Sequence, residues 1–248
     1  MEERSFNPEN GTVGEPATLF PVDRPELYGQ GSRRVAGSSR FWALANGGDE
    51  LVVVDRESKQ ATPIGTRPQL TNGAVSPDGR WAASGFFHGE GVPLCDVPRR
   101  TLDRILWDVA GAARVEFSPD GNWLAVSTSH ETRVFETTGW TVALTRPRTD
   151  SSDIWVPIAF SPDSRSLVLT DNQWDLNLYE LPPENSGAEV PPQIWTRVAR
   201  LGSPEPAYGG MARFSVDGRF LARANWSQVQ LWNLESLKSH LREQGLAL

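Results

Sequence analysis

The sequence has few of the residue types that most often carry catalysis or bind metals. It contains one cysteine, Cys95, in 248 residues, so neither an internal disulfide nor a cysteine pair for a metal can form. Its three histidines, His88, His130 and His240, lie far apart and form no His-Glu-x-x-His motif. No Gly-x-Ser-x-Gly nucleophile motif occurs either. We therefore predict no metal, no cofactor and no catalytic residues.

Long apolar runs and clusters of basic residues are also missing. No segment approaches the ~18 apolar residues of a membrane span, and residues 1–8 lack the apolar core of a secretory signal. Lysine and arginine total 24 against 31 aspartates and glutamates, and the net charge is −7. Nucleic-acid binding normally requires a basic surface. We expect a cytoplasmic protein that inserts into no membrane and binds no nucleic acid.

The sequence does contain a repeat built around the tetrapeptide Ser-Pro-Asp-Gly. Its four copies, some of them altered, are Val75–Trp81, Phe117–Trp123, Phe160–Ser166 and Phe214–Phe220. Their serines are separated by 42, 43 and 54 residues, and an insertion rich in proline, residues 182–192, accounts for the longest interval. A period near 40 to 45 residues is typical of four-stranded propeller blades.

Each copy predicts a hairpin followed by a third strand. Proline presets φ at the first corner of the turn, aspartate bonds back to the backbone, and glycine accepts a positive φ. Apolar runs flank the turn as strands a and b. A third run, strand c, ends in the pairs Cys95-Asp96, Phe135-Glu136, Tyr179-Glu180 and Trp232-Asn233. Residues 35–64 form a degenerate fifth copy without the turn motif.

These c-strand endings lie where WD-repeat proteins keep Trp-Asp, and the chain resembles a WD-repeat β-propeller. Two stretches, Ser84–Gly89 and Gly111–Ser118, and the tail Leu231–Leu246 are similar to the WD-repeat regions of large bacterial signalling proteins of the planctomycete type. Those proteins are often fused to serine/threonine kinase domains. The resemblance implies an all-β propeller of about five four-stranded blades, either a complete small ring or part of a larger one, with a short C-terminal helix.

The sequence divides into three parts. Residues 1–30, rich in proline, glycine and acidic groups, are expected to form a flexible arm, and residues 31–234 the blades. Within the arm, residues 17–22 are either part of a disordered tail or an edge strand that closes the ring on the last blade. Residues 235–248 form an amphipathic helix, because Leu234, Leu237 and Leu241 recur at helical spacing. An open ring would leave edges through which copies associate.

The resemblance implies a non-catalytic protein-interaction scaffold or sensor of a bacterial signalling system. In WD-type propellers the b–c and d–a loops share one rim, and aromatic and arginine side chains on loops are typical binding residues. The residues expected to bind a protein partner on this rim are Phe86, His88, Arg148, Trp155, Trp174 and Trp226.

The alternative from another functional class is a glycosidase-like hydrolase with carboxylates in the central channel. That chemistry needs two acids roughly 5 to 9.5 Å apart. The repeating aspartates are turn formers, and Asp96, Glu136 and Glu180 end c strands. A channel lined by small residues such as Ala112 and Ala113 would favour the scaffold, and convergent acids would favour the hydrolase.

Overall fold

The computed structural model describes residues 2–3, 6–7, 12–13, 17–18, 34–38, 40–45, 50–65, 70–86, 89–149, 157–172, 175–181, 195–202, 210–225 and 228–243. Five antiparallel sheets follow one another along the chain, and each corresponds to one predicted blade. Within each blade the strands pair in chain order, and we name them a to d from first to last. The prediction of an all-β fold with five blades is confirmed.

The first three blades each have four strands. Blade 1 consists of β5 (Arg34–Gly37), β6 (Phe41–Ala45), β7 (Glu50–Asp55) and β8 (Gln60–Gly65). Blade 2 consists of β9 (Leu70–Val75), β10 (Trp81–Phe86), β11 (Gly89–Asp96) and β12 (Thr101–Gly111). Blade 3 consists of β13 (Ala113–Phe117), β14 (Trp123–Thr128), β15 (Glu131–Glu136) and β16 (Thr141–Pro147).

The last two blades differ in their number of strands. Blade 4 consists of β17 (Ala159–Phe160), β18 (Ser166–Leu169), β19 (Leu176–Glu180) and β20 (Thr196–Leu201). Blade 5 has only β21 (Met211–Phe214), β22 (Phe220–Ala224) and β23 (Val229–Asn233) among the described residues. The chain then enters helix α1 (Leu234–Glu243), and Oδ1 of Asn233 caps the helix by accepting a hydrogen bond from the Ser236 N–H at 3.0 Å.

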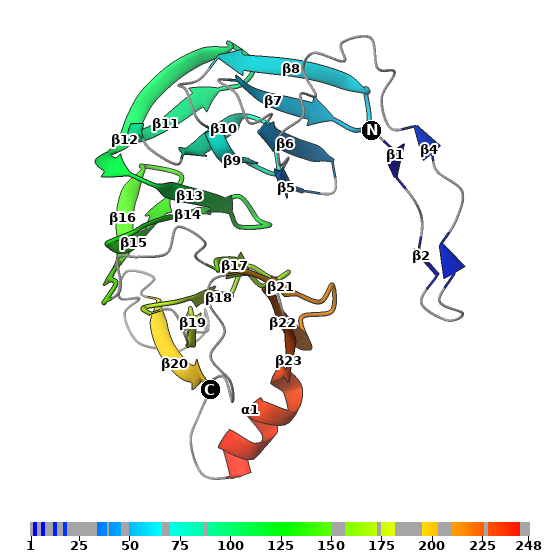
Figure 1. Ribbon diagram of the computed structural model, residues 1–248, viewed down its shortest axis with the longest axis vertical. Coiled ribbons are helices and arrows are strands. Elements are labelled where there is room, and N and C mark those ends of the chain that lie inside the picture. Colours follow the sequence, from blue (N-terminus) through cyan, green and yellow to red (C-terminus); the bar gives the residue numbers. More distant parts are fainter. Residues whose placement is uncertain are drawn as a thin grey trace.

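Figure 1 shows the five blades following one another along an arc, with the a strands on its inner side. The sheets pack face to face through four apolar clusters, one at each junction of neighbouring blades. Indole rings contribute at the junction of blades 3 and 4, where Trp123 and Trp195 meet edge to face with ring centroids 5.6 Å apart. Among the described residues, no strand pairing joins blade 5 to blade 1.

The predicted turns form as the Ser-Pro-Asp-Gly motif requires. In blade 2, the Ser76 hydroxyl donates to Oδ1 of Asp78 at 2.5 Å and accepts the Trp81 N–H at 2.9 Å. Gly79 has φ +73° and donates its N–H to the Ser76 carbonyl. The same serine–aspartate bond recurs in the other three copies, at Ser118, Ser161 and Ser215. In each turn the serine, the aspartate and the backbone are thus held together by hydrogen bonds within the motif.

The N-terminal region forms two short strand pairs. β1 (Glu2–Glu3) pairs with β4 (Ala17–Thr18), and β2 (Phe6–Asn7) pairs with β3 (Thr12–Val13). The expected edge strand at 17–22 therefore begins with Ala17 and Thr18 paired locally rather than with blade 5, and residues 19–22 lie outside the described residues. Local pairing requires the closure of a much shorter loop than pairing with blade 5 would.

Candidate functional site

The b–c and d–a rim is only partly described, and two of its predicted binding residues can be placed. His88, Trp155, Trp174 and Trp226 lie outside the described residues. Arg148 is half-buried just after β16, and its Nη1 donates a hydrogen bond to the Thr128 carbonyl at 2.9 Å. Its guanidinium thus joins the end of strand d to the end of strand b in blade 3.

Phe86 was predicted to lie on an exposed binding loop, but the structure buries it at the end of a strand. It ends β10, is 3% exposed and packs in the core between blades 2 and 3. The register of β10 against β9 shifts between Gly85 and Phe86, because Gly85 pairs with Asn72 and Phe86 with Leu70. Phe86 belongs to the same apolar cluster as Ala83. Phe86 is therefore a packing residue in this structure.

A cavity of about 390 Å³ lies on the inner side of the arc, at the end that carries the a–b turns. Its lining includes residues from all five blades. Apolar walls come from the ends of the a strands and the turns that follow them, and the lining residues of this kind are Ala74, Val75, Pro77, Phe117, Pro119 and Phe160. The structure thus places a concave surface, with apolar and polar parts of similar extent, where the inner strands converge.

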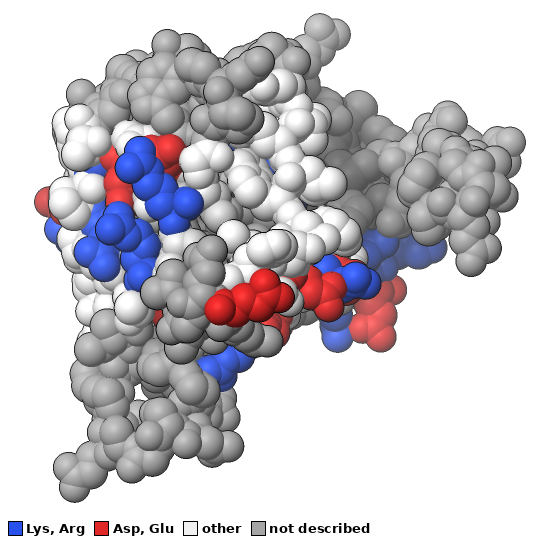
Figure 2. All heavy atoms as spheres, turned by 90° about the horizontal axis from the view of Figure 1, so that it is seen from below, with Lys and Arg blue, Asp and Glu red and all other residues white. Residues whose placement is uncertain are grey.

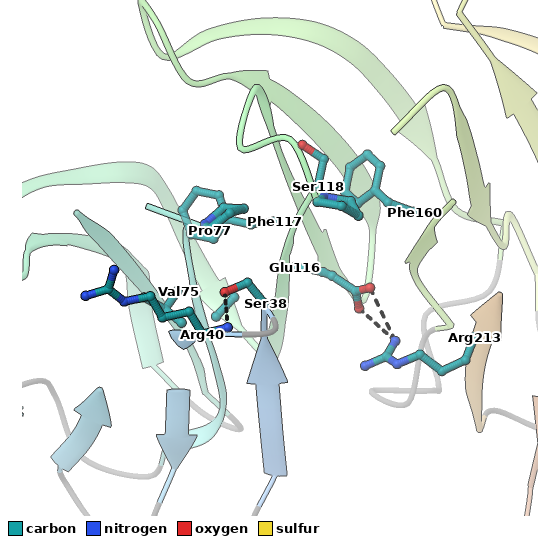
Figure 3. Close-up of a pocket in the computed structure, with 11 residues that line it drawn as sticks. Ser38, Arg40, Val75, Pro77, Glu116, Phe117, Ser118, Phe160 and Arg213 are labelled. Atoms are coloured by element: carbon teal, nitrogen blue, oxygen red, sulfur yellow. Dashed lines mark hydrogen bonds and ion pairs between the residues drawn. The ribbon is translucent and has the colours of Figure 1, made fainter. Parts of the chain in front are cut away.

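Two opposite charges meet in this cavity, as Figure 3 shows. Nη1 of Arg213, on strand a of blade 5, lies 3.0 Å from Oε2 and 3.3 Å from Oε1 of Glu116, on strand a of blade 3. The same nitrogen also donates to the carbonyls of Ala212 at 3.0 Å and Ile158 at 3.4 Å. Arg213 therefore connects strands a of blades 3 and 5 with the segment that precedes strand a of blade 4.

The second arginine of the lining, Arg40, is paired with carboxylates of blade 1. Its Nη2 lies 3.0 Å from Oδ2 of Asp55, and its Nη1 lies 2.8 Å from Oε2 of Glu57. The hydrogen bond from Arg40 is the largest of the effects that hold the pKa of the Asp55 carboxyl well below its usual value. All three charged lining residues, Arg40, Glu116 and Arg213, thus have a partner of opposite sign.

The cavity does not match the two-carboxylate site of the hydrolase alternative. Glu116 is the single carboxylate among the described lining residues, and it is ion-paired. Of the two alanines expected to line the channel, Ala113 is buried in the core between blades 2 and 3. The cavity is lined by the bulky Phe117 and Phe160 as well as by small residues such as Ala74 and Ser118.

Glu116 and Arg213 were missed as site residues, although the repeat contains a signal for them. Both stand two positions before the serine of the turn, where the other two copies carry Ala74 and Ala159. Equivalent positions in successive blades approach the same axis, so opposite charges at one repeat position can meet. An alignment of the four copies by their turns would have shown this pair.

The remaining reactive side chains offer no second site within the described part of the chain. Burial raises the pKa of the Cys95 thiol to about 11, which keeps this thiol protonated and unreactive at neutral pH. No group of three or more His, Cys, Asp and Glu side chains lies close enough there to hold a metal ion. In Figure 2, blue and red atoms adjoin one another on the face shown, in keeping with the many ion pairs.

Comparison with known structures identifies the architecture. The chain is similar to the β-propeller domain of Cps50 (Swd1) from Myceliophteria thermophila, with a TM-score of 0.61 over 92% of this chain and 75% of that one. The fold is a β-propeller. At 11% sequence identity the likeness concerns the fold alone. No family model matches the sequence, and no curated protein matches it. No helix in the described part of the propeller is long and apolar enough to cross a membrane.

Proposed function

We propose that this propeller is a non-catalytic protein-interaction module, a scaffold or sensor of a cytoplasmic bacterial signalling system. The observation that carries this proposal is the cavity of about 390 Å³ formed jointly by the five blades. A concave site on a rigid framework is the usual form of a recognition site. Because its turns are fixed by their own hydrogen bonds, the framework needs little ordering when a partner binds.

The chemistry of the cavity fits a segment of a partner protein. Phe117 and Phe160 offer apolar surface, and the Glu116–Arg213 pair offers a donor and an acceptor side by side. A peptide backbone or a polar side chain can hydrogen-bond to such a pair without requiring a net charge. The lack of a second carboxylate among the described lining residues favours recognition over glycoside hydrolysis.

The opposite rim remains a second part of the proposed surface. His88, Arg148, Trp155, Trp174 and Trp226 belong to its loops or adjoin them, and tryptophan and arginine dominate binding energies at protein interfaces. We propose that a partner contacts this rim as well, with Phe86 excluded because it is buried.

The test compares the two rims with a purified partner, which affinity capture and mass spectrometry would first identify. Pro119→Trp places an indole in the cavity lining, and the turn position accepts a residue other than proline because Val216 occupies it in blade 5. Pro162→Trp is the matched control, since Pro162 occupies the same repeat position outside this cavity. We expect Pro119→Trp to weaken binding at least tenfold and Pro162→Trp to leave it unchanged.

On the other rim, Trp174→Ala and Trp226→Ala should each weaken binding by ~1–2 kcal/mol with the melting temperature nearly unchanged. If binding survives Pro119→Trp and both tryptophan variants, the proposed surface is wrong. The non-catalytic assignment has its own test with glycoside, ester and phosphoester substrates. Turnover that is lost in Glu116→Gln would show that the cavity is an active site.

A further inference from the structure

The two faces of blade 5 differ sharply in what covers them. Directly paired residues of an antiparallel sheet share a face, so the register of β21, β22 and β23 assigns each side chain to one side. Ala212, Phe214, Leu221 and Trp232 lie on the face that packs against blade 4. The apolar residues on the other face are Met211, Phe220, Ala222, Ala224, Val229 and Leu231.

This second face is exposed, although its composition resembles that of a core. Val229 is 71% exposed, Leu231 64% and Met211 40%. Among the described residues, the other exposed large hydrophobic side chains lie apart from this face. They are Leu102 on blade 2, Val142 on blade 3 and Val216 in the turn of blade 5. Contiguous exposed apolar side chains on one sheet face indicate an interface.

The edge of blade 5 is open as well. β23 has one paired neighbour, β22, whereas strand c of every other blade also pairs with a strand d. α1 leaves the blade at Leu234 and packs its Leu234 and Leu237 in the cluster shared with blade 4. Among the described residues, the helix thus packs on the face of blade 5 that is turned to blade 4. It leaves the opposite face bare, and we call this opposite face the outer face of blade 5.

We propose that this outer face of blade 5 is a homodimer interface, in which the same face of a second copy packs against it across a two-fold axis. Charge is the first argument for a second copy. The register places Arg213 on this face, and the guanidinium of Arg219 lies over the ring of Phe220. Both arginines are ion-paired within their own chain, Arg213 with Glu116 and Arg219 with Glu235. Two identical faces can therefore approach without like charges opposing each other, despite the net charge of −7.

The second argument concerns the other end of the arc. A head-to-tail contact would need the outer face of blade 1, which the register assigns to Leu44, Val52 and Val54 among others. These side chains are only 3%, 1% and 0% exposed. Among the described side chains, the middle of this blade 1 face is thus already covered, and it offers less bare apolar surface than blade 5 does. The isologous contact of two blade 5 faces closes on itself and produces a dimer rather than a filament.

The area available makes the dimer weak. A stable interface buries about 800 Å² on each partner, and one three-stranded sheet face supplies less than that. We therefore expect a dissociation constant on the order of tens of micromolar. Because the contact is apolar, added salt should strengthen it or leave it unchanged, whereas a contact between opposite charges would weaken.

Sedimentation velocity from roughly 1 µM to 500 µM, a range that brackets this affinity, tests the proposal on the full chain. The wild type should shift from monomer to dimer over this range. It should do the same in sodium chloride at ~0.5 M, where exposed charges are screened. Leu231→Glu should remain monomeric throughout. Leu102→Glu is the matched control, because Leu102 is 53% exposed on β12 of blade 2, and it should dimerise as the wild type does.

Cross-linking supplies a second readout that does not depend on a charged substitution. Under mild oxidation Leu231→Cys should form a disulfide-linked dimer, while Leu102→Cys and the wild type, whose Cys95 is buried, should not. A wild type that stays monomeric at all concentrations would overturn the proposal. So would dimerisation that survives Leu231→Glu or that is lost equally in Leu102→Glu, because the interface would then lie elsewhere.

Discussion

Glu116 and Arg213 are 97 residues apart in the sequence, and their side chains meet on the inner side of the arc with Oε2 and Nη1 3.0 Å apart. They belong to the a strands of blades 3 and 5, and the intervening blade 4 contributes the Ile158 carbonyl to the same arginine. The pair therefore links blades that are not neighbours in the chain. We expect it to contribute to the curvature of the arc as well as to the cavity.

Removal of this pair should lower stability modestly. The Glu116 side chain is 15% exposed and that of Arg213 45%, so solvent screens much of the interaction. Glu116→Gln should reduce the free energy of unfolding by about 1 kcal/mol or less. Urea unfolding of Glu116→Gln, Arg213→Gln and the double variant would give the coupling energy. A coupling of zero would show that the pair contributes nothing to the arc.

Gly85 should tolerate no side chain. A Cβ at this position would lie 2.3 Å from the Ala113 carbonyl oxygen and 2.5 Å from Oδ1 of Asn72. That Asn72 oxygen accepts the Val115 N–H at 3.2 Å and so links blades 2 and 3. We expect Gly85→Ala to cost roughly 2 kcal/mol or more, because a backbone carbonyl cannot move aside cheaply.

Gly65→Ala is the control for this prediction, since a Cβ there meets nothing within 4 Å. Thermal unfolding of the two variants should differ clearly, with Gly65→Ala close to the wild type. Equal melting temperatures would mean that blades 2 and 3 pack less closely than the structure shows.

Ser164 should be preferred over alanine in the turn of blade 4. It replaces the glycine of the motif, and it has φ +60°, a value that is unfavourable for any residue with a Cβ. Its hydroxyl accepts the Asp120 N–H from the turn of blade 3 at 2.9 Å. Ser164→Ala keeps the strain and loses this bond, so we expect a loss of about 1 kcal/mol.

Ser164→Gly loses the same bond but relieves the backbone strain, and it should be less destabilising than Ser164→Ala. Chemical denaturation of the two variants gives this order directly. If Ser164→Ala is the more stable, the bond between the two turns is not formed in solution.

Asp217, in the turn of blade 5, should make stability depend on pH in acid. The hydrogen bond from Ser215 is the largest of the effects that lower the pKa of Asp217 below 3.8. An acid with a lowered folded pKa stabilises the fold above its unfolded pKa, and this contribution is lost as the pH falls through the folded value. Ser215→Ala should therefore flatten the rise in stability between roughly pH 2 and pH 4, a range set by the ordinary aspartate pKa.

Urea midpoints measured across that range would test the prediction. Thr141→Ala is a suitable control, because Thr141 is exposed on β16, and its hydroxyl makes only a long hydrogen bond of 3.4 Å to Glu136. A profile for Ser215→Ala parallel to that of the wild type would show that the Ser215 hydroxyl does not set the pKa of Asp217.

Much of the fold could be predicted because its signals are local. In each turn the serine hydroxyl accepts a hydrogen bond from the backbone N–H five residues later, as Ser76 does from Trp81. The motif therefore specifies a hairpin wherever it occurs. The spacing of the motifs then gives the number of blades, and Leu234 and Leu237 give the helix. Blade 5 has three strands among the described residues where the other blades have four, and its chain enters α1 directly after Asn233.

The sequence by itself thus determined the repeat and the hairpins, because these depend on residues close together in the chain. Only the tertiary structure decided which side chains share a surface. The packing of blade 3 against blade 2 buried Phe86, and the curvature of the arc brought Glu116 to Arg213. The end of the arc at blade 5 left Leu231 bare. Each of these outcomes depends on the placement of whole blades, which no local pattern encodes.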